Sequence, residues 1–210
     1  VKANVYMKNG RIAAITAEED IPAARVINAE GRLVLPGFVD PHTHLNDPPG
    51  GDVSETFLTG TRSAAAGGVT TCIEMPLTTP VVSTAKAFID KRAICGPKAV
   101  VDFAMFGACV PGNQDEIQKM LAHGAVAFKA FTPFSIEIPR LDDASMLKAM
   151  ESLGREQVTL SIHCENADMI TSLTEELQAQ GRVKPGDYQH AHPLISELEA
   201  VQRVALMAYK

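Results

Sequence analysis

The sequence contains no tryptophan, and its four cysteines are so widely separated that no two of them form a CxxC pair. This spacing argues against a zinc ribbon and against a thioredoxin-like redox site. Scattered thiols favour a reducing compartment, so we expect the protein to be cytoplasmic. Lys and Arg form no cluster and are outnumbered by acidic residues, 19 against 25. This charge balance argues against a nucleic-acid partner.

Long hydrophobic runs are also missing, since none approaches the roughly 18 residues that a membrane-spanning helix needs. We therefore expect no membrane partner. The composition is otherwise that of a globular chain, with 46% hydrophobic and 21% charged residues among 210. A chain of this length can bury a core without disulfides or a structural metal.

The first 35 residues differ in pattern from the rest of the chain. Two apolar segments flank the dipeptide Asn9-Gly10, which is a strong signal for a β-hairpin. A further short strand is expected at residues 25–28. We assign residues 1–35 to the N-terminal part of a small β-sandwich domain.

Residues 36–210 predict strands that alternate with helices. Five apolar segments, expected to be buried strands, occupy residues 33–39, 69–75, 100–106, 126–131 and 158–162. Helical patterns occupy residues 113–124, 142–154, 167–181 and 196–210. Strands that are continuously rather than alternately hydrophobic indicate a parallel sheet covered on both faces. We therefore assign residues 36–210 to five successive βα units.

Both a doubly wound sheet and a (β/α)8 TIM-type barrel contain such units. The doubly wound nucleotide-binding fold would place GxGxxG after the first strand, where residues 40–44 read DPHTH instead. Polar residues follow several different strands, as they do in the sites of barrels. The prediction is an α/β fold with the first five units of a TIM-type barrel. Because such a barrel typically needs about 250 residues, we expect the sequence to be part of a longer chain.

The motif Asp40-x-His42-x-His44 is the strongest chemical signal in the sequence. Side chains two positions apart on a strand point to the same side, so one metal ion can bind both imidazoles. A pair of exposed loop histidines is the alternative for an arbitrary HxH motif. The position of this motif at the end of an apolar strand favours metal binding.

Lys129 lies within the apolar segment AFKAF at residues 127–131. A buried lysine must lose its charge, find a partner or be modified, because burying a bare ammonium group is costly. A neutral lysine is a nucleophile that can form a Schiff base, or react with CO2 to give a carbamate that bridges two metal ions. A side chain that extends to solvent at the strand end is the alternative.

The remaining polar candidates are weaker. His163 ends the fifth predicted strand, so it can join the metal site if the strand ends converge. Cys164, next to it, is expected to point to the opposite face and pack. Glu74 is equally compatible with substrate binding, support of the site or capping of the next segment. His190 and His192 are interpreted as solvated loop residues.

These segments, taken together, resemble the amidohydrolase superfamily, in particular its cyclic amidohydrolases. The resemblance spans nearly the whole chain in order and rests on LPGFVDPHTH at 35–44, GGVTTCIEMP at 67–76, GAVAFKAF at 124–131 and HCEN at 163–166. Within that group the sequence is most similar to the allantoinase family. Dihydroorotases typically have Arg where this chain has Asn46, and hydantoinases usually have Tyr where it has Phe134. Hydantoinase/dihydropyrimidinase-like and dihydroorotase-like enzymes stay as alternatives.

The resemblance implies hydrolysis of a cyclic amide by a hydroxide that bridges two divalent metal ions, with zinc the expected ion. His42 and His44 would bind one ion, His163 the other, and N-carboxylated Lys129 would bridge them. Asn46 would contact a small cyclic amide or ureide substrate, most simply allantoin, which is opened to allantoate in purine catabolism. The family's fourth histidine and its catalytic Asp are expected beyond residue 210.

Two further expectations accompany this assignment. The resemblance implies a homo-oligomer, either a dimer or a tetramer. A non-catalytic homologue that acts in binding or assembly is the alternative to an enzyme, and it would need missing or idle metal ligands. The presence of all four ligand positions argues against that alternative.

Overall fold

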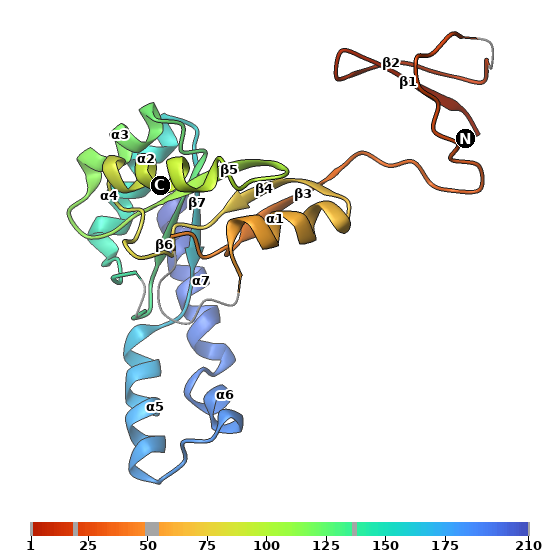
Figure 1. Cartoon of the computed structure of the whole chain (residues 1–210). Helices are drawn as coiled ribbons and strands as arrows, with labels where there is room; N and C mark the ends of the chain where they lie inside the picture. The colour runs from red at the N-terminus through yellow and green to blue at the C-terminus, as the bar shows by residue number, and fades with distance from the viewer. Residues whose placement is uncertain (1, 19–20, 49–54, 136–137, 210) are drawn as a thin grey trace. The chain divides into compact units, whose positions relative to one another are not determined.

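The computed structural model describes residues 2–18, 21–48, 55–135 and 138–209. The chain divides into two compact units, Val1–Pro36 and Gly37–Lys210. Figure 1 traces both units from the N-terminus to the C-terminus.

The first unit contains an antiparallel hairpin of β1 (Asn4–Lys8) and β2 (Arg11–Thr16). Asn9 and Gly10 connect the strands with positive φ angles of 53° and 72°, as the predicted tight turn requires. The strand expected at residues 25–28 was wrong. Those residues are exposed and pair with no strand in the described part of the chain, and an unpaired segment cannot form a sheet.

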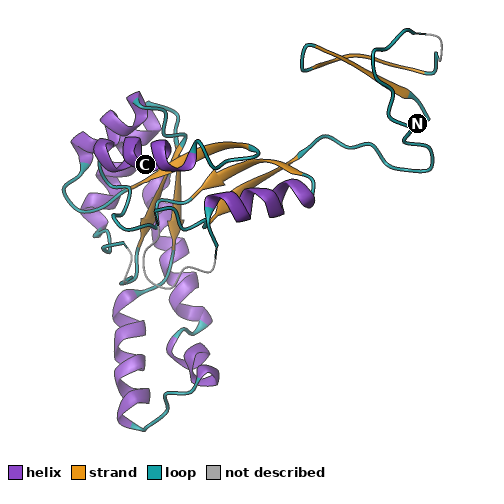
Figure 2. Ribbon diagram, viewed as in Figure 1, coloured by secondary structure: helices purple, strands orange, loops and turns teal. Residues whose placement is uncertain are grey.

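The second unit contains a five-stranded sheet, shown in orange in Figure 2. All neighbouring strands are parallel and follow one another in chain order. The strands are β3 (Phe38–Thr43), β4 (Val69–Glu74), β5 (Asp102–Ala108), β6 (Ala127–Phe131) and β7 (Thr159–His163). This curled sheet with its helices confirms the predicted α/β fold and the first five units of a TIM-type barrel.

The first strand of this sheet begins later in the chain than predicted. Residues 33–37 are exposed and form no strand, because pairing with β4 starts only at Phe38, opposite Val69. The strand then continues to Thr43. As a result His42 lies within β3 and His44 directly follows it, which fixes the direction of both side chains.

A helix follows each strand of this sheet, whereas the helices within residues 167–191 extend away from the strands (Figures 1 and 2). The helices are α1 (Phe57–Ala66), α2 (Ala85–Cys95), α3 (Gln114–Ala122), α4 (Asp143–Arg155), α5 (Ala167–Ala179), η1 (Pro185–Asp187), α6 (Tyr188–Ala191) and α7 (Leu194–Ala208). The last helix begins two residues before the predicted start. The main core lies between strands and helices, with Phe88, Met120 and Phe128 almost completely buried. Among the described residues no helix is long and apolar enough to cross a bilayer.

Candidate metal centre

The segment that carries the two histidines alternates in exposure beyond the end of β3. Thr43, Leu45 and Asp47 are buried, whereas His42 and His44 are exposed. This is the two-residue period of an extended chain, in which neighbouring side chains point to opposite sides. The alternation confirms that both imidazoles occupy the same side of the chain.

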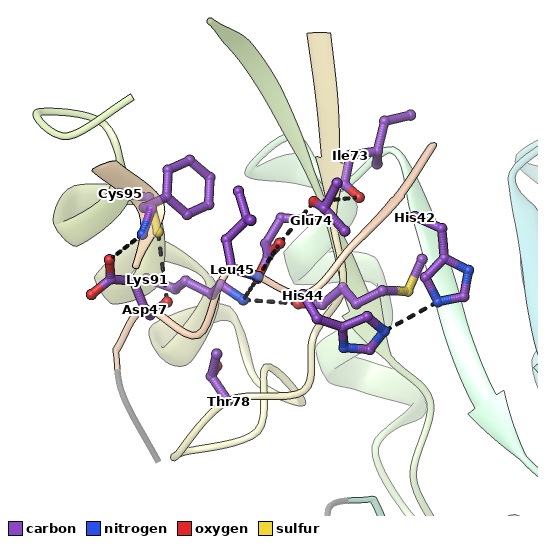
Figure 3. Close-up of polar contacts among 12 residues, drawn as sticks. His42, His44, Leu45, Asp47, Ile73, Glu74, Thr78, Lys91 and Cys95 are labelled. Carbon is purple, nitrogen blue, oxygen red and sulfur yellow. Dashed lines mark hydrogen bonds and ion pairs between the residues drawn. The ribbon is translucent and has the colours of Figure 1, made fainter. Parts of the chain in front are cut away.

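The two imidazoles also converge (Figure 3). Nε2 of His42 lies 3.2 Å from Nε2 of His44, and the ring centroids are 5.2 Å apart. Two nitrogen ligands at the usual zinc distance in a tetrahedral site would be separated by about 3.3 Å. The observed separation therefore matches that of two ligands of one metal ion.

The surroundings of His42 favour its neutral form. Burial is the largest effect that lowers the pKa of His42, followed by the positive charges of Lys129 and His44, while Asp40 opposes them. Only a neutral imidazole has a lone pair for a metal. The charge of Lys129 thus lowers the pKa of His42 even though their strands, β6 and β3, are not neighbours in the sheet.

Lys129 is buried, as its position in an apolar strand predicted. Its exposure is 6%, and every residue of β6 is buried. Within the described ranges no Asp or Glu forms an ion pair with its ammonium group, and burial lowers the pKa of Lys129. Nζ lies instead 5.1 Å from the centroid of the Phe131 ring, within the range of a cation–π contact. The alternative of a side chain extended into solvent was wrong.

Phe131 connects Lys129 with the last strand. Its ring stacks on the imidazole of His163 at a centroid distance of 5.2 Å, and the two residues are direct partners in the β6–β7 register. Lys129 and His163 thus contact the same aromatic ring. Cys164, the next residue, is half-buried, and burial raises the pKa of its thiol.

His163 is supported by an acidic neighbour that sequence analysis did not single out. Nε2 of His163 lies 2.9 Å from Glu165, whose other carboxylate oxygen lies 2.8 Å from Nδ1 of His192. Burial alone would raise the pKa of Glu165, but its hydrogen bonds to the two histidines outweigh burial and lower it. The interpretation of His192 as a solvated loop residue was wrong, because its ring also stacks on Tyr188. His190 is exposed, as expected, but it belongs to α6 and not to a loop.

Glu74 does not face the histidines but lies on the buried side of the chain (Figure 3). Its carboxylate accepts hydrogen bonds from the hydroxyl of Thr43 at 2.9 Å and from the backbone N–H of Leu45 at 3.1 Å. It also forms an ion pair with Lys91 of α2 at 3.0 Å. Of the interpretations left open for Glu74, its environment favours support of the neighbouring chain. Sequence analysis missed Lys91, since a lysine in the KR pair of a helix resembles a solvated residue.

Asn46 and Asp47 complete the described part of this segment. Asn46 is half-exposed and adopts a φ of 34°, in the left-handed region that Asn tolerates better than most residues. The buried carboxylate of Asp47 accepts a hydrogen bond of 2.7 Å from the N–H of Phe57 at the start of α1. It also pairs with Lys98 at 2.7 Å. Asp47 is thus the second buried carboxylate, after Glu74, that holds this segment, and sequence analysis did not identify it.

The structure therefore brings some of the predicted ligands together and leaves others apart. His42 and His44 face each other, and the charge of Lys129 acts on His42. His163 belongs to a separate pair with Glu165. Across the described residues, no group of three or more His, Cys, Asp and Glu side chains is arranged to hold a single ion.

Comparison with known proteins assigns this half-barrel to a family. The pattern of the amidohydrolase family matches residues 33–201. The chain belongs to the amidohydrolase family.

Similarity to individual proteins extends over nearly the whole chain. An L-hydantoinase of Paenarthrobacter aurescens is 36% identical over 98% of the chain, and an allantoinase of Solibacter usitatus (strain Ellin6076) is 39% identical over 99%. The solved structure of an L-hydantoinase (dihydropyrimidinase) from Arthrobacter aurescens superimposes with a TM-score of 0.92 at 34% identity and covers the entire chain. The chain spans about half of these proteins, namely 46% of both relatives and 47% of the solved structure.

Proposed function

We propose that the protein is a metal-dependent hydrolase that opens a cyclic amide, with allantoin as the substrate and allantoate as the product. The observation that carries the proposal is the convergence of His42 and His44 at 3.2 Å beside the buried charge of Lys129. The family assignment and the similarity to an allantoinase and an L-hydantoinase support this reaction class.

The donor set fits two divalent metal ions, with zinc as the expected ion. His42 and His44 would bind the first ion through the nitrogens that face each other, and His163 would bind the second. Bound ions would lower the pKa of water and polarise the amide carbonyl. The protein contributes neutral imidazole at His42, since burial and neighbouring positive charge lower its pKa.

Lys129 is proposed to carry the bridging group after carboxylation. Burial lowers the pKa of Lys129, which increases the fraction of neutral amine at a given pH. The amine nitrogen forms a bond to the carbon of CO2 and releases one proton to solvent, leaving a carbamate anion. The carbamate replaces a buried cation with a carboxylate-like group that metal ions can compensate.

The substrate preference rests on the residues near the histidines. Asn46, proposed to contact the substrate, lies two residues after His44, is half-exposed and offers a neutral amide. A neutral amide suits an uncharged ureide better than a carboxylate, which argues against dihydroorotate. Phe134 is 69% exposed and cannot donate the hydrogen bond that a Tyr would offer a hydantoin.

A hydantoinase is the second candidate function. The identity to the L-hydantoinase, 36%, is close to that to the allantoinase, 39%. The purified full chain should be assayed with allantoin, 5-substituted hydantoins and dihydroorotate, together with its metal content. Preferential hydrolysis of allantoin with about two zinc ions per chain is expected. Preference for hydantoins would favour the second candidate, and a chain with less than one metal and no turnover would favour a non-catalytic binding or assembly role.

Cellular location and assembly are part of the proposal. All four cysteines are free, and three of them are buried, which is compatible with a cytoplasmic protein. We propose a homo-oligomer, either a dimer or a tetramer. Analytical ultracentrifugation of the full chain should give a sedimenting mass of two or four subunits, and a monomer at micromolar concentration would contradict it.

A further inference from the structure

The buried ion pair of Glu74 and Lys91 contacts the chain segment that carries the two histidines. The side chains are 1% and 2% exposed, and their charged atoms are 3.0 Å apart. Glu74 ends β4 and Lys91 belongs to α2, so the pair joins two elements at the end of the strands where the histidines lie. Nothing in the proposed chemistry uses either charge.

Every hydrogen bond of the Glu74 carboxylate within the described chain leads either to Lys91 or to the histidine segment. The hydroxyl of Thr43 donates to Oε2, and the N–H of Leu45 donates to both oxygens. Thr43 and Leu45 are the residues before and after His44. A single carboxylate therefore holds the chain on both sides of this imidazole.

Lys91 in turn fixes the position of the carboxylate. Its ammonium group donates to Oε1 of Glu74 and, at 2.8 Å, to the carbonyl oxygen of Met75. The N–H of Met75 donates to the carbonyl oxygen of Thr43 at 2.8 Å, which closes the connection. The ammonium group of Lys91 is thus bound to Glu74 and Met75 at the end of β4, and these contacts in turn stabilise that strand end.

A buried ion pair is a poor means of stabilising a fold, because desolvation cancels most of the attraction and apolar replacements are often as stable. Its presence directly beside the histidine segment calls for a role in positioning. We propose that Glu74 and Lys91 are positioning residues that fix His44 relative to His42 at the separation a metal ion requires. This inference rests on the proposed function, since it needs the two histidines to be ligands.

The test replaces the pair with apolar side chains of similar volume, Glu74→Leu together with Lys91→Met, in the full chain. Zinc affinity is measured by competition with a chelator, and the visible absorption of bound Co2+ reports the ligand geometry. The zinc Kd should rise about 10–100-fold, the range typical for outer partners of metal ligands. The Co2+ absorption should change, while the thermal midpoint stays near that of the unmodified protein.

Two variants serve as references. Lys86→Met breaks an exposed pair with Asp90 on the same helix, where the side chains are 84% and 55% exposed, and should leave zinc affinity unchanged. His44→Asn removes a proposed ligand and should lose bound zinc. If His44→Asn keeps its full zinc content, the proposed function fails. If His44→Asn loses zinc while the double variant binds it with unchanged Kd and Co2+ absorption, only the positioning role fails.

If the double variant does not fold, Glu74→Gln tests the positioning role instead. The amide preserves the volume of Glu74 but has a single acceptor oxygen, so its NH2 group must face either Lys91 or the donors of Thr43 and Leu45. In either orientation the ion pair with Lys91 loses its negative charge, and the N–H of Leu45 keeps only one of its two acceptor oxygens. A rise in zinc Kd of at least about fivefold is expected, within the range for outer partners, and an unchanged Kd would overturn the positioning role.

Discussion

Nδ1 of His192 lies 2.8 Å from one oxygen of Glu165, and the other oxygen lies 2.9 Å from Nε2 of His163. Because a carboxylate only accepts hydrogen bonds, each of these ring nitrogens must carry a proton. The lone pair of neutral His163 is therefore at Nδ1. His192, which directly follows α6, thus helps to select the tautomer of His163, the proposed metal ligand at the end of β7.

His192→Ala should weaken zinc binding at the position served by His163. Without His192, Glu165 loses one of two partners and holds the His163 ring less firmly. The Kd of one of the two zinc ions is expected to rise at least about tenfold, as for other outer partners of metal ligands. His190→Ala, at an exposed residue of the short helix α6 that precedes His192, is the matched control. Two zinc ions bound with unchanged affinity in His192→Ala would contradict the assignment.

Lys129→Met should abolish metal binding without lowering the stability of the metal-free protein. The substitution removes a buried ammonium group that has no carboxylate partner in the described chain, while Met fills a similar volume. The metal-free variant is expected to unfold at a urea concentration no lower than that of the metal-free parent. Bound zinc and hydrolytic activity should both be lost, as measured by metal analysis and substrate assay. Retention of full activity would exclude the carbamate.

Gly107→Ala should destabilise the sheet next to its most buried aromatic residue. A Cβ at this position of β5 would lie 2.5 Å from Cε1 of Phe128 and 3.1 Å from Sδ of Met120, and both side chains are fully buried. Overpacking of this kind typically costs about 1–3 kcal/mol, measured by urea unfolding. Gly154→Ala in α4 meets no atom within 4 Å and should instead stabilise by about 0.5 kcal/mol. Equal effects of the two substitutions would contradict the packing described here.

Glu199 should make the stability of the helical C-terminal region depend on pH. A hydrogen bond from Asn166, which caps α5, lowers the pKa of Glu199, with a further contribution from Arg203. Since the folded pKa lies below the unfolded one, the stabilisation is complete above about pH 4.5 and is lost as the pH falls through the folded pKa. Glu199→Gln should lower the unfolding free energy by less than about 1 kcal/mol at pH 7, because the group is partly exposed. In urea unfolding the difference should shrink as the pH falls below about 4.5, and a difference that stays constant would refute the linkage.

The parts of the site that could be predicted from sequence are those set by local periodicity. The shared side of His42 and His44 follows from a two-residue period, and the burial of Lys129 follows from a strand that is apolar throughout. Both properties depend on neighbours in the chain. The late start of β3 at Phe38 could not be predicted in this way, because apolar residues precede it and only pairing with β4 decides which of them form the strand.

The supporting residues could not be predicted for a related reason. Lys91 lies beside Arg92 on a helix, a pattern typical of a solvated surface, and its burial depends on the end of a different strand. His192 precedes Pro193 in a polar segment, and its contact with Glu165 exists only because the chain returns after α5. Positions like these are set by tertiary contacts that no sequence period encodes.

The alternation of exposure from His42 to Asp47 has a consequence for how this segment can vary. Deletion or insertion of one residue between Asp40 and His44 would exchange the two sides of the chain. An imidazole would then face the carboxylate of Glu74, and an aliphatic side chain would face Lys129. The function proposed for this segment thus depends on its length as well as on its side chains, so we expect natural variation in length to occur outside residues 40–47.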